Sequence, residues 1–177
     1  MMARLPVALL LPAAACQLVF SIERSPDPDA VVGADAGSDA EVRPRWSALA
    51  AGYEFTCGIA ADTRALYCWG RNTYGQLGVG TSEPSNQPLP VSHDRPWRMV
   101  SAGFDHACAI DDDQAMWCWG YNGDGRLGVG NNVSSAVPTR VQGSWKYVDA
   151  GHISSCAIDA DDALHCWGSG ANSRLGN

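Results

Sequence analysis

One short stretch occurs three times in the chain, and this repetition limits the folds that the chain can adopt. Each copy opens with a tryptophan, continues through Ala-Gly and Cys-x-Ile, and reaches a Cys-Trp-Gly triplet followed by a glycine-rich loop. The tryptophans of the triplets, Trp69, Trp119 and Trp167, are 50 and 48 residues apart. A repeat of that length is typical of a propeller or a solenoid.

Apolar residues alternate within each copy, which predicts an antiparallel hairpin. In the middle copy Cys108 and Ile110 share one face, and Met116 and Cys118 have the same spacing beyond a polar turn. Pairing Cys108 with Cys118 places Ile110 opposite Met116, and the other two copies allow the same register. The first copy has one extra residue, which falls in the turn, where insertions are tolerated.

The paired cysteines indicate disulfide bonds. Directly opposite residues of an antiparallel pair have Cα atoms about 4.5 to 5.5 Å apart, which is within the range of a disulfide. We therefore predict three bridges inside the hairpins: Cys57 with Cys68, Cys108 with Cys118, and Cys156 with Cys166. A metal site or free thiols are the alternatives, but a spacing of nine or ten residues without a matching histidine pair fits zinc poorly. Each small loop closed in this way contributes about 2 to 3 kcal/mol.

The complete pattern resembles the regulator of chromosome condensation repeat, in the cysteine-paired form of exported bacterial lipoproteins. The pattern is Trp-x-x-Val/Leu-x-Ala-Gly, Cys-x-Ile, Cys-Trp-Gly-x-Asn-x-x-Gly-x-Leu-Gly-x-Gly and Pro-x-x-Val. The resemblance covers three copies, at residues 46–96, 97–144 and a shorter 145–177. It implies an all-β fold of β-propeller blades, each a short four-stranded antiparallel sheet. The third copy departs from the pattern at Gly170 and Ser173.

The first sixteen residues have the features of an export signal. A minimal basic start is followed by an apolar run and by three alanines before Cys16. Small residues followed by a cysteine resemble a bacterial lipoprotein signal, so Cys16 is the predicted lipidation site. Cleavage by an ordinary signal peptidase is the alternative. Seven cysteines make three repeat pairs plus Cys16, which favours lipidation because exported proteins seldom leave a thiol unused.

Residues 17–45 have the composition of an acidic linker rich in Pro, Ala and Asp. From residue 21 onward this stretch holds no aromatic side chain, so it cannot bury enough apolar surface to offset its chain entropy. The sequence therefore predicts a disordered tether between a membrane and the repeats. The predicted location is the cell envelope, with a lipid anchor in a bacterial membrane, or secretion if the anchor is absent.

Three copies are fewer than the roughly four to eight blades of a closed propeller. An unclosed ring leaves blade faces and strand edges open. The sequence therefore predicts an incomplete or assembling ring: either the chain is a fragment of a longer reading frame, or it forms a homo-oligomer if it is complete.

Motifs for chemistry are weak in this sequence. Gly123, Gly125 and Gly128 spell G-x-G-x-x-G, but they follow a hairpin instead of opening a helix in a βαβ unit. The acidic turn 111–113 could bind calcium or supply a carboxylate pair, yet it lacks the ligand spacing of a calcium loop, so a solvated hairpin tip is favoured. The four histidines occupy unrelated repeat positions. We therefore predict no catalytic residue, no metal and no cofactor.

A formal net charge of −7 with a single lysine argues against binding to nucleic acid, which depends on clustered cations. The chromatin attachment and nucleotide exchange of the eukaryotic family member are therefore not carried over to this chain.

The loops after the Cys-Trp-Gly triplets are the predicted partner-binding residues, because aromatic and arginine residues recur there around a rigid ring. They are Arg71, Asn72, Tyr74, Tyr121, Asn122, Arg126, Asn172 and Arg174. In the alternative interpretation, Asn and Gly shape the turns and Arg lies in solvent. The favoured function is a non-enzymatic, surface-anchored scaffold that binds an unidentified protein or glycan. The alternatives are an exported hydrolase and a truncated gene product without a function of its own.

Overall fold

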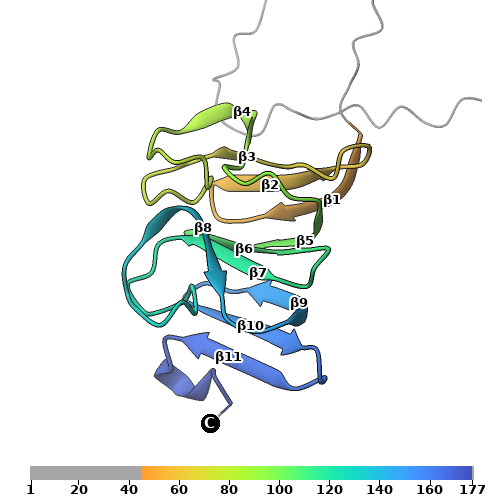
Figure 1. Cartoon of the computed structure of the whole chain (residues 1–177). Helices are drawn as coiled ribbons and strands as arrows, with labels where there is room; N and C mark the ends of the chain where they lie inside the picture. The colour runs from red at the N-terminus through yellow and green to blue at the C-terminus, as the bar shows by residue number, and fades with distance from the viewer. Residues whose placement is uncertain (1–44, 177) are drawn as a thin grey trace, which may run out of the picture. The chain divides into compact units, whose positions relative to one another are not determined.

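The computed structural model describes residues 45–176. These residues form three antiparallel sheets, one from each copy of the repeat, which follow one another in space in chain order (Figure 1). The predicted export signal, Cys16 and the predicted linker up to residue 44 lie outside the described residues. In residues 45–176 there is no α-helix, and thus no helix that could span a membrane.

The strands of each sheet pair in sequence order. The first sheet contains β1 (Trp46–Ala51), β2 (Phe55–Ala60), β3 (Leu66–Gly70) and β4 (Ser85–Pro90). The second contains β5 (Trp97–Ala102), β6 (His106–Asp111), β7 (Met116–Gly120) and β8 (Ser135–Val141). The third contains β9 (Trp145–Ala150), β10 (Ser154–Asp159) and β11 (Leu164–Gly168), and a short 3₁₀ turn, η1 (Ala171–Ser173), follows it.

The predicted hairpin register is confirmed in all three copies. Cys108 lies opposite Cys118 and Ile110 opposite Met116, and the first and third sheets have the corresponding pairs. The three predicted disulfides are formed in the structure, each with its two Cα atoms 4.1 Å apart. The sheets are the open, unclosed array of propeller blades that the repeat predicts.

Each sheet has two apolar faces with different residues, because side chains alternate along a strand. One face, here called the disulfide face, carries the bridge together with an Ile on the second strand and a Leu or Met on the third. The opposite face, here called the tryptophan face, carries the tryptophans of the first strand and of the Cys-Trp-Gly triplet. The buried core forms where the disulfide face of one sheet packs on the tryptophan face of the next.

The Cys-Trp-Gly tryptophans fix the spacing between sheets. The indole Nε1 of Trp119 donates to the backbone carbonyl of Gln76 at 2.9 Å, and that of Trp167 donates to Arg126 at 2.9 Å. Gly78 and Gly128 lie beneath these rings: a Cβ on either one would come within 2.7 Å or 2.6 Å of the indole nitrogen. The glycine of each of the first two Leu-Gly motifs is thus required by the tryptophan of the following repeat.

Candidate partner-binding face

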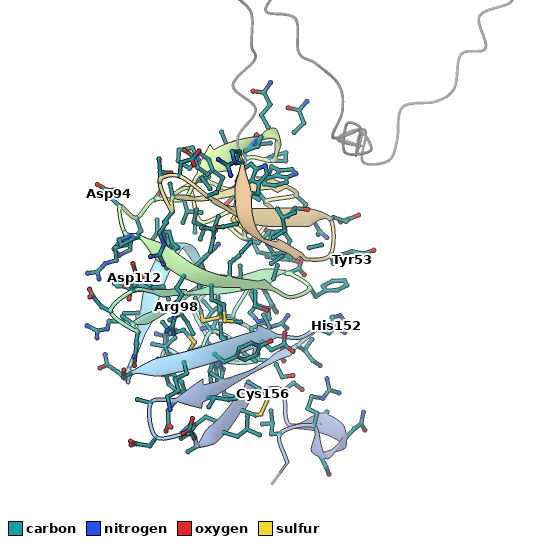
Figure 2. The ribbon with its side chains drawn as sticks, turned by 90° about the vertical axis from the view of Figure 1, so that its right-hand side faces the viewer. Tyr53, Asp94, Arg98, Asp112, His152 and Cys156 are labelled. Atoms are coloured by element: carbon teal, nitrogen blue, oxygen red, sulfur yellow. A yellow bond between two sulfur atoms is a disulfide. The ribbon has the colours of Figure 1, made fainter. Side chains whose placement is uncertain are left out.

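Two sets of loops meet at one end of the sheets. Phe55, at the start of β2, pairs with Gly70, at the end of β3, so the β1–β2 loop and the loop after β3 lie at the same end. The second and third sheets repeat this arrangement. We call this end the loop face. Figure 2 shows Tyr53 and His152 there, and Asp94 and Asp112 at the opposite end of the strands.

Two of the predicted binding residues, Asn72 and Asn122, are fully buried and hold their loops together. The Nδ2 of Asn72 donates to the carbonyls of Thr81 and Glu83 at 2.9 and 2.8 Å, and its Oδ1 accepts from the backbone of Leu77. Asn122 makes the equivalent bonds in the second sheet. An amide serves here because it both donates and accepts.

The predicted arginines and tyrosines of the first two loops lie together. The rings of Tyr74 and Tyr121 have centroids 4.8 Å apart, and Tyr74 is 38 % exposed. The guanidinium of Arg71 lies 5.8 Å from the ring of Tyr74. Arg126 lies 4.7 Å from the ring of Tyr121 but is buried. Its guanidinium donates to the carbonyl of His152 at 3.0 Å and pairs with Asp124.

Of the last two predicted residues, Asn172 lies within η1 and Arg174 directly follows it. Asn172 and Arg174 are both exposed, and the Nε of Arg174 donates to the carbonyl of Ala171 at 2.7 Å. Asn172 has a φ of 60°, a conformation that asparagine tolerates better than most residues. These two side chains are therefore accessible, unlike the asparagines of the first two loops.

A column of three aromatic side chains in contact runs across the loop face, and it was not predicted from the sequence. Tyr53, Phe104 and His152 each follow the Ala-Gly pair of their repeat. The rings of Tyr53 and Phe104 are 4.1 Å apart and nearly parallel, at 11°, and Phe104 lies 4.2 Å from His152. Tyr53 is 49 % exposed. An aromatic ring after every Ala-Gly was the signal in the sequence that could have revealed the column.

The backbone holds this column in place. The amide of Tyr53 donates to the carbonyl of Gly103 at 3.1 Å, and the amide of Phe104 donates to the carbonyl of Gly151 at 3.2 Å. These bonds join neighbouring sheets directly. A side chain at Gly52 would bring a Cβ within 2.6 Å of the Gly103 carbonyl, so the glycine permits the close approach of the loops.

The column borders a shallow hollow of about 360 Å³, which the three Ala-Gly-aromatic loops line. Charged groups adjoin it in the first two sheets. Arg71 pairs with Glu54 at 3.0 Å and lies 3.8 Å from Asp105, which is mostly buried. Rigid aromatic rings beside a few charged groups can recognise a protein or peptide surface.

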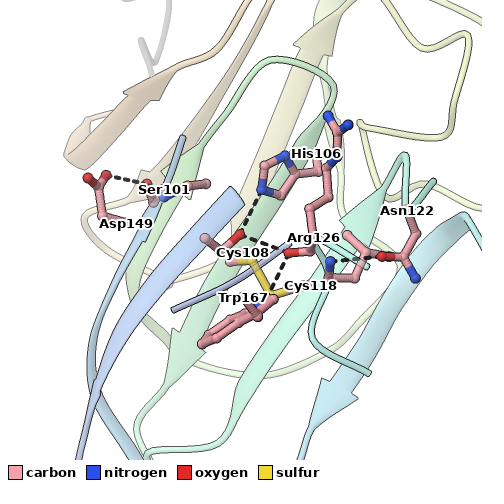
Figure 3. The surroundings of a disulfide bond; sticks show 11 residues. Ser101, His106, Cys108, Cys118, Asn122, Arg126, Asp149 and Trp167 are labelled. Atoms are coloured by element: carbon pink, nitrogen blue, oxygen red, sulfur yellow. Dashed lines mark hydrogen bonds between the residues drawn. A yellow bond between two sulfur atoms is a disulfide. The ribbon is translucent and has the colours of Figure 1, made fainter. Parts of the chain in front are cut away.

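A histidine and a serine meet between the second and third sheets, but they are buried. The Nε2 of His106 lies 2.8 Å from the Oγ of Ser155, which donates its own hydrogen to the carbonyl of Arg126 at 2.8 Å (Figure 3). Burial, and the charge of Arg126, lower the pKa of His106 to about 3, so the ring is neutral. This pair joins two sheets and is closed to substrate.

The acidic turns lie at the end opposite the loop face and have local partners. The carboxylate of Asp111 accepts from the backbone of Ala115 and pairs with Arg95 at 3.0 Å. In the third sheet, a hydrogen bond from His165 lowers the pKa of Asp159. Within residues 45–176, no group of three or more acidic, histidine or cysteine side chains has the arrangement of a metal site.

Comparison with known sequences identifies the repeat. The Regulator of chromosome condensation (RCC1) repeat matches residues 65–110 and 113–158, which is more than half of the chain, and a second form of the same repeat matches residues 46–76 and 99–126. The chain belongs to the RCC1 repeat family. The predicted family is thus confirmed at the level of the repeat.

Several solved structures share the fold. Human WBSCR16 superposes with a TM-score of 0.63 at 22 % identity, over 70 % of this chain and 33 % of that one. Prp20p from Saccharomyces cerevisiae gives a TM-score of 0.67 at 21 % identity, over 75 % of this chain and 35 % of that one. The ectodomain of the receptor kinase CR4 from Physcomitrella patens gives 0.50 at 24 % identity, over 70 % and 29 %. The chain therefore spans about a third of the length of these solved structures.

Proposed function

We propose that this RCC1-repeat protein is a non-enzymatic scaffold that binds a partner protein through its loop face. The observation that carries the proposal is the column of Tyr53, Phe104 and His152. The rings of Tyr53 and Phe104 are stacked, and that of His152 lies against Phe104 at a tilt of 54°. Backbone bonds between neighbouring sheets hold Tyr53 and Phe104, and all three rings are at least partly accessible at one end of the strands. Rigid, partly exposed aromatic side chains are the usual anchors of protein interfaces, because they lose little conformational entropy on binding.

The arginine and tyrosine residues predicted from the sequence extend this surface outward. Tyr74, Tyr121 and Arg71 lie in the loops after β3 and β7 on the same face, and Arg71 pairs with Glu54 beside Tyr53. Asn172 and Arg174 follow β11 in the third copy. The buried Asn72, Asn122 and Arg126 shape and support the surface instead of contacting a partner.

The comparisons are consistent with protein binding. Prp20p is known for its binding properties to Gsp1p and histones, and a second structure has Kap60 bound to the same yeast protein. Those partners belong to Prp20p. For the present chain only the class of partner is proposed, a protein, and the net charge of −7 does not favour nucleic acid.

We further propose that the scaffold acts outside the cytosol, anchored by a lipid on Cys16. Three disulfides favour an oxidising compartment. Replacing Cys16 with serine should release the protein from membranes into the soluble fraction. If the Cys16→Ser chain partitions as the unchanged chain does, the lipid anchor is wrong.

The experiment for the loop face uses a random peptide library displayed on phage, with a glycan array in parallel. We expect peptides that bind the chain and lose roughly tenfold or more in affinity for Phe104→Ala. Tyr53→Phe is the matched control, because it keeps the stacked ring and removes only the hydroxyl, and it should retain binding.

Three results would contradict the proposal. Selected peptides that bind Phe104→Ala as tightly as the unchanged chain would place the site elsewhere. Binding on the glycan array alone would make the partner a carbohydrate. Absence of ligands from both probes would remove the support for a binding role of this face.

A further inference from the structure

The chain forms the same interface between sheets twice, and sheets one and three each have one further open face of the two kinds that meet there. Within the described part of the chain, sheet three has three strands and lacks a counterpart of Val91 and Val141, which are buried in the internal interfaces. In the first interface the disulfide face of sheet one packs on the tryptophan face of sheet two, and the second interface repeats this with sheets two and three. The tryptophan face of sheet one and the disulfide face of sheet three are not paired with another sheet in residues 45–176. The two internal interfaces show how such faces are normally covered.

The disulfide face of sheet three presents the residues that are buried at the same positions elsewhere. Leu164 is 69 % exposed, whereas its counterparts Leu66 and Met116 are 2 % and 0 % exposed. Leu164 lies in a row with Ile158 and Tyr147, which the register places side by side across β11, β10 and β9. Tyr147 is 50 % exposed. The row is an apolar surface across all three strands.

The site for an indole is also present on this sheet. Gly176 occupies the position of Gly78 and Gly128, which lie beneath Trp119 and Trp167. It has a φ of 78°, and a Cβ built on it would meet no described atom within 4 Å. The carbonyl of Arg174 corresponds to those of Gln76 and Arg126, which accept the indole N–H in the two internal interfaces.

The tryptophan face of sheet one presents the complementary residues. Leu49 is 63 % exposed, whereas Val100 and Val148 at the same position are 7 % and 0 % exposed. Trp46 is half-buried, whereas its counterparts Trp97 and Trp145 are 1 % and 7 % exposed.

We propose that the disulfide face of sheet three docks on the tryptophan face of sheet one of a second copy, in the geometry of the internal interfaces. Trp69 of the second copy would cover Gly176 and donate to the Arg174 carbonyl, and Leu164 would be buried. Two copies joined head to tail in this way bring six sheets together, within the roughly four to eight blades of closed propellers. The contact joins two different faces, so copies associate head to tail. They form a closed ring only if the rotation from one copy to the next returns to the first copy. This association is separate from the partner bound at the loop face.

The experiment measures the mass of the 177-residue chain by sedimentation over a concentration series, with the disulfides oxidised. A Cys16→Ser background prevents an intermolecular disulfide through that residue from imitating association. We expect reversible formation of a species of two copies. Leu164→Asp should weaken the association roughly 100-fold or more, because it places a charge in an apolar interface.

A matched control tests whether a new charge at any exposed apolar position weakens the association, or only one on the disulfide face of sheet three. Val133 is 71 % exposed, close to the value for Leu164, but it lies in the loop before β8 and outside both open faces. Val133→Asp should leave the association unchanged. Because Leu164 is exposed in the single chain, Leu164→Asp should also keep the unfolding temperature that the unchanged chain has at concentrations where it is a monomer.

A mixing experiment tests that two different faces meet. Leu49→Asp damages only the tryptophan face of sheet one, and Leu164→Asp damages only the disulfide face of sheet three. Neither variant should associate alone, but a mixture should form a species with one copy of each, since one intact interface remains. A single-copy mass for the unchanged chain at all concentrations would overturn the proposal, and so would association that survives Leu164→Asp or a mixture without the mixed species.

Discussion

At the scale of single residues, two facing positions show how the interface between sheets differs from one repeat to the next. Phe55 in sheet one packs near Ala107 of sheet two, whereas the same two positions hold His106 and Ser155 between sheets two and three. The polar pair is hydrogen-bonded, so its burial is tolerated. Because His106 can take up a proton, the second interface is sensitive to pH. The first interface has Phe55 and Ala107 at these positions, and neither side chain titrates.

We predict that acid destabilises the protein through His106. Its pKa is about 3 in the folded chain, lowered from 6.5, so unfolding takes up a proton at pH values between these two. Stability from this group is complete above pH 6.5 and is lost as pH falls, by roughly 1.4 kcal/mol per pH unit well below 6.5. The measurement is urea unfolding from about pH 7 to about pH 4. The double variant His106→Phe with Ser155→Ala, which copies the first interface, should flatten this dependence; an unchanged slope would refute the assignment.

Two glycines of one loop allow backbone strain to be separated from steric contact. Gly128 and Gly130 both have a positive φ, of 69° and 80°, but only Gly128 lies beneath an indole, while Gly130 has no described neighbour within 4 Å. We predict that Gly130→Ala costs about 1 to 2 kcal/mol from the left-handed conformation alone. Gly128→Ala should cost about 1 to 3 kcal/mol more, because it overpacks against Trp167. Equal unfolding free energies for the two variants would show that the indole contact does not constrain the loop.

At the scale of the strand pair, the three disulfides are chemically alike but differ in burial. Cys57, Cys68, Cys108 and Cys118 are fully buried between sheets, whereas Cys156 and Cys166 are half-buried on the open face of sheet three. The local sequence could not reveal this difference, since all three hairpins have the same pattern.

We predict that dithiothreitol reduces Cys156–Cys166 first, because an attacking thiolate reaches it without separating two sheets. Alkylation at intervals followed by peptide mapping gives the order of reduction. At concentrations that favour the proposed pairing of two copies, Leu164 and this disulfide should both be covered, and the reduction should slow. Simultaneous loss of all three bridges would mean that global unfolding limits the reaction.

The loops after Cys-Trp-Gly show where the local pattern was ambiguous. Asn72 and Asn122 recur because their amides close the loop around Leu77 and Leu127, which is the turn-shaping interpretation. The sequence shows that these loops recur in each repeat. It could not separate a side chain that recurs to build the loop from one that recurs to contact a partner, because both give the same periodicity.

At the scale of the whole molecule, neighbouring sheets are joined by contacts between one repeat and the next. The indole bonds from Trp119 and Trp167, the amide bonds at the loop face and the His106–Ser155 pair all join neighbouring copies. Stability in such an array is carried by contacts between neighbours. Covering the open faces of sheets one and three by assembly should therefore add the most to the stability of the protein.

The all-β class, the three hairpins, their register and the disulfides follow from the amino-acid sequence alone. Each of these depends on alternation along a strand and on pairs about ten residues apart, such as Cys108 with Cys118. The column of Tyr53, Phe104 and His152, the burial of Arg126 and the difference between open and closed faces became evident from the packing of the sheets. These depend on residues of neighbouring repeats that meet only when sheet stacks on sheet, and alternation along a single strand does not report which residues of two sheets meet.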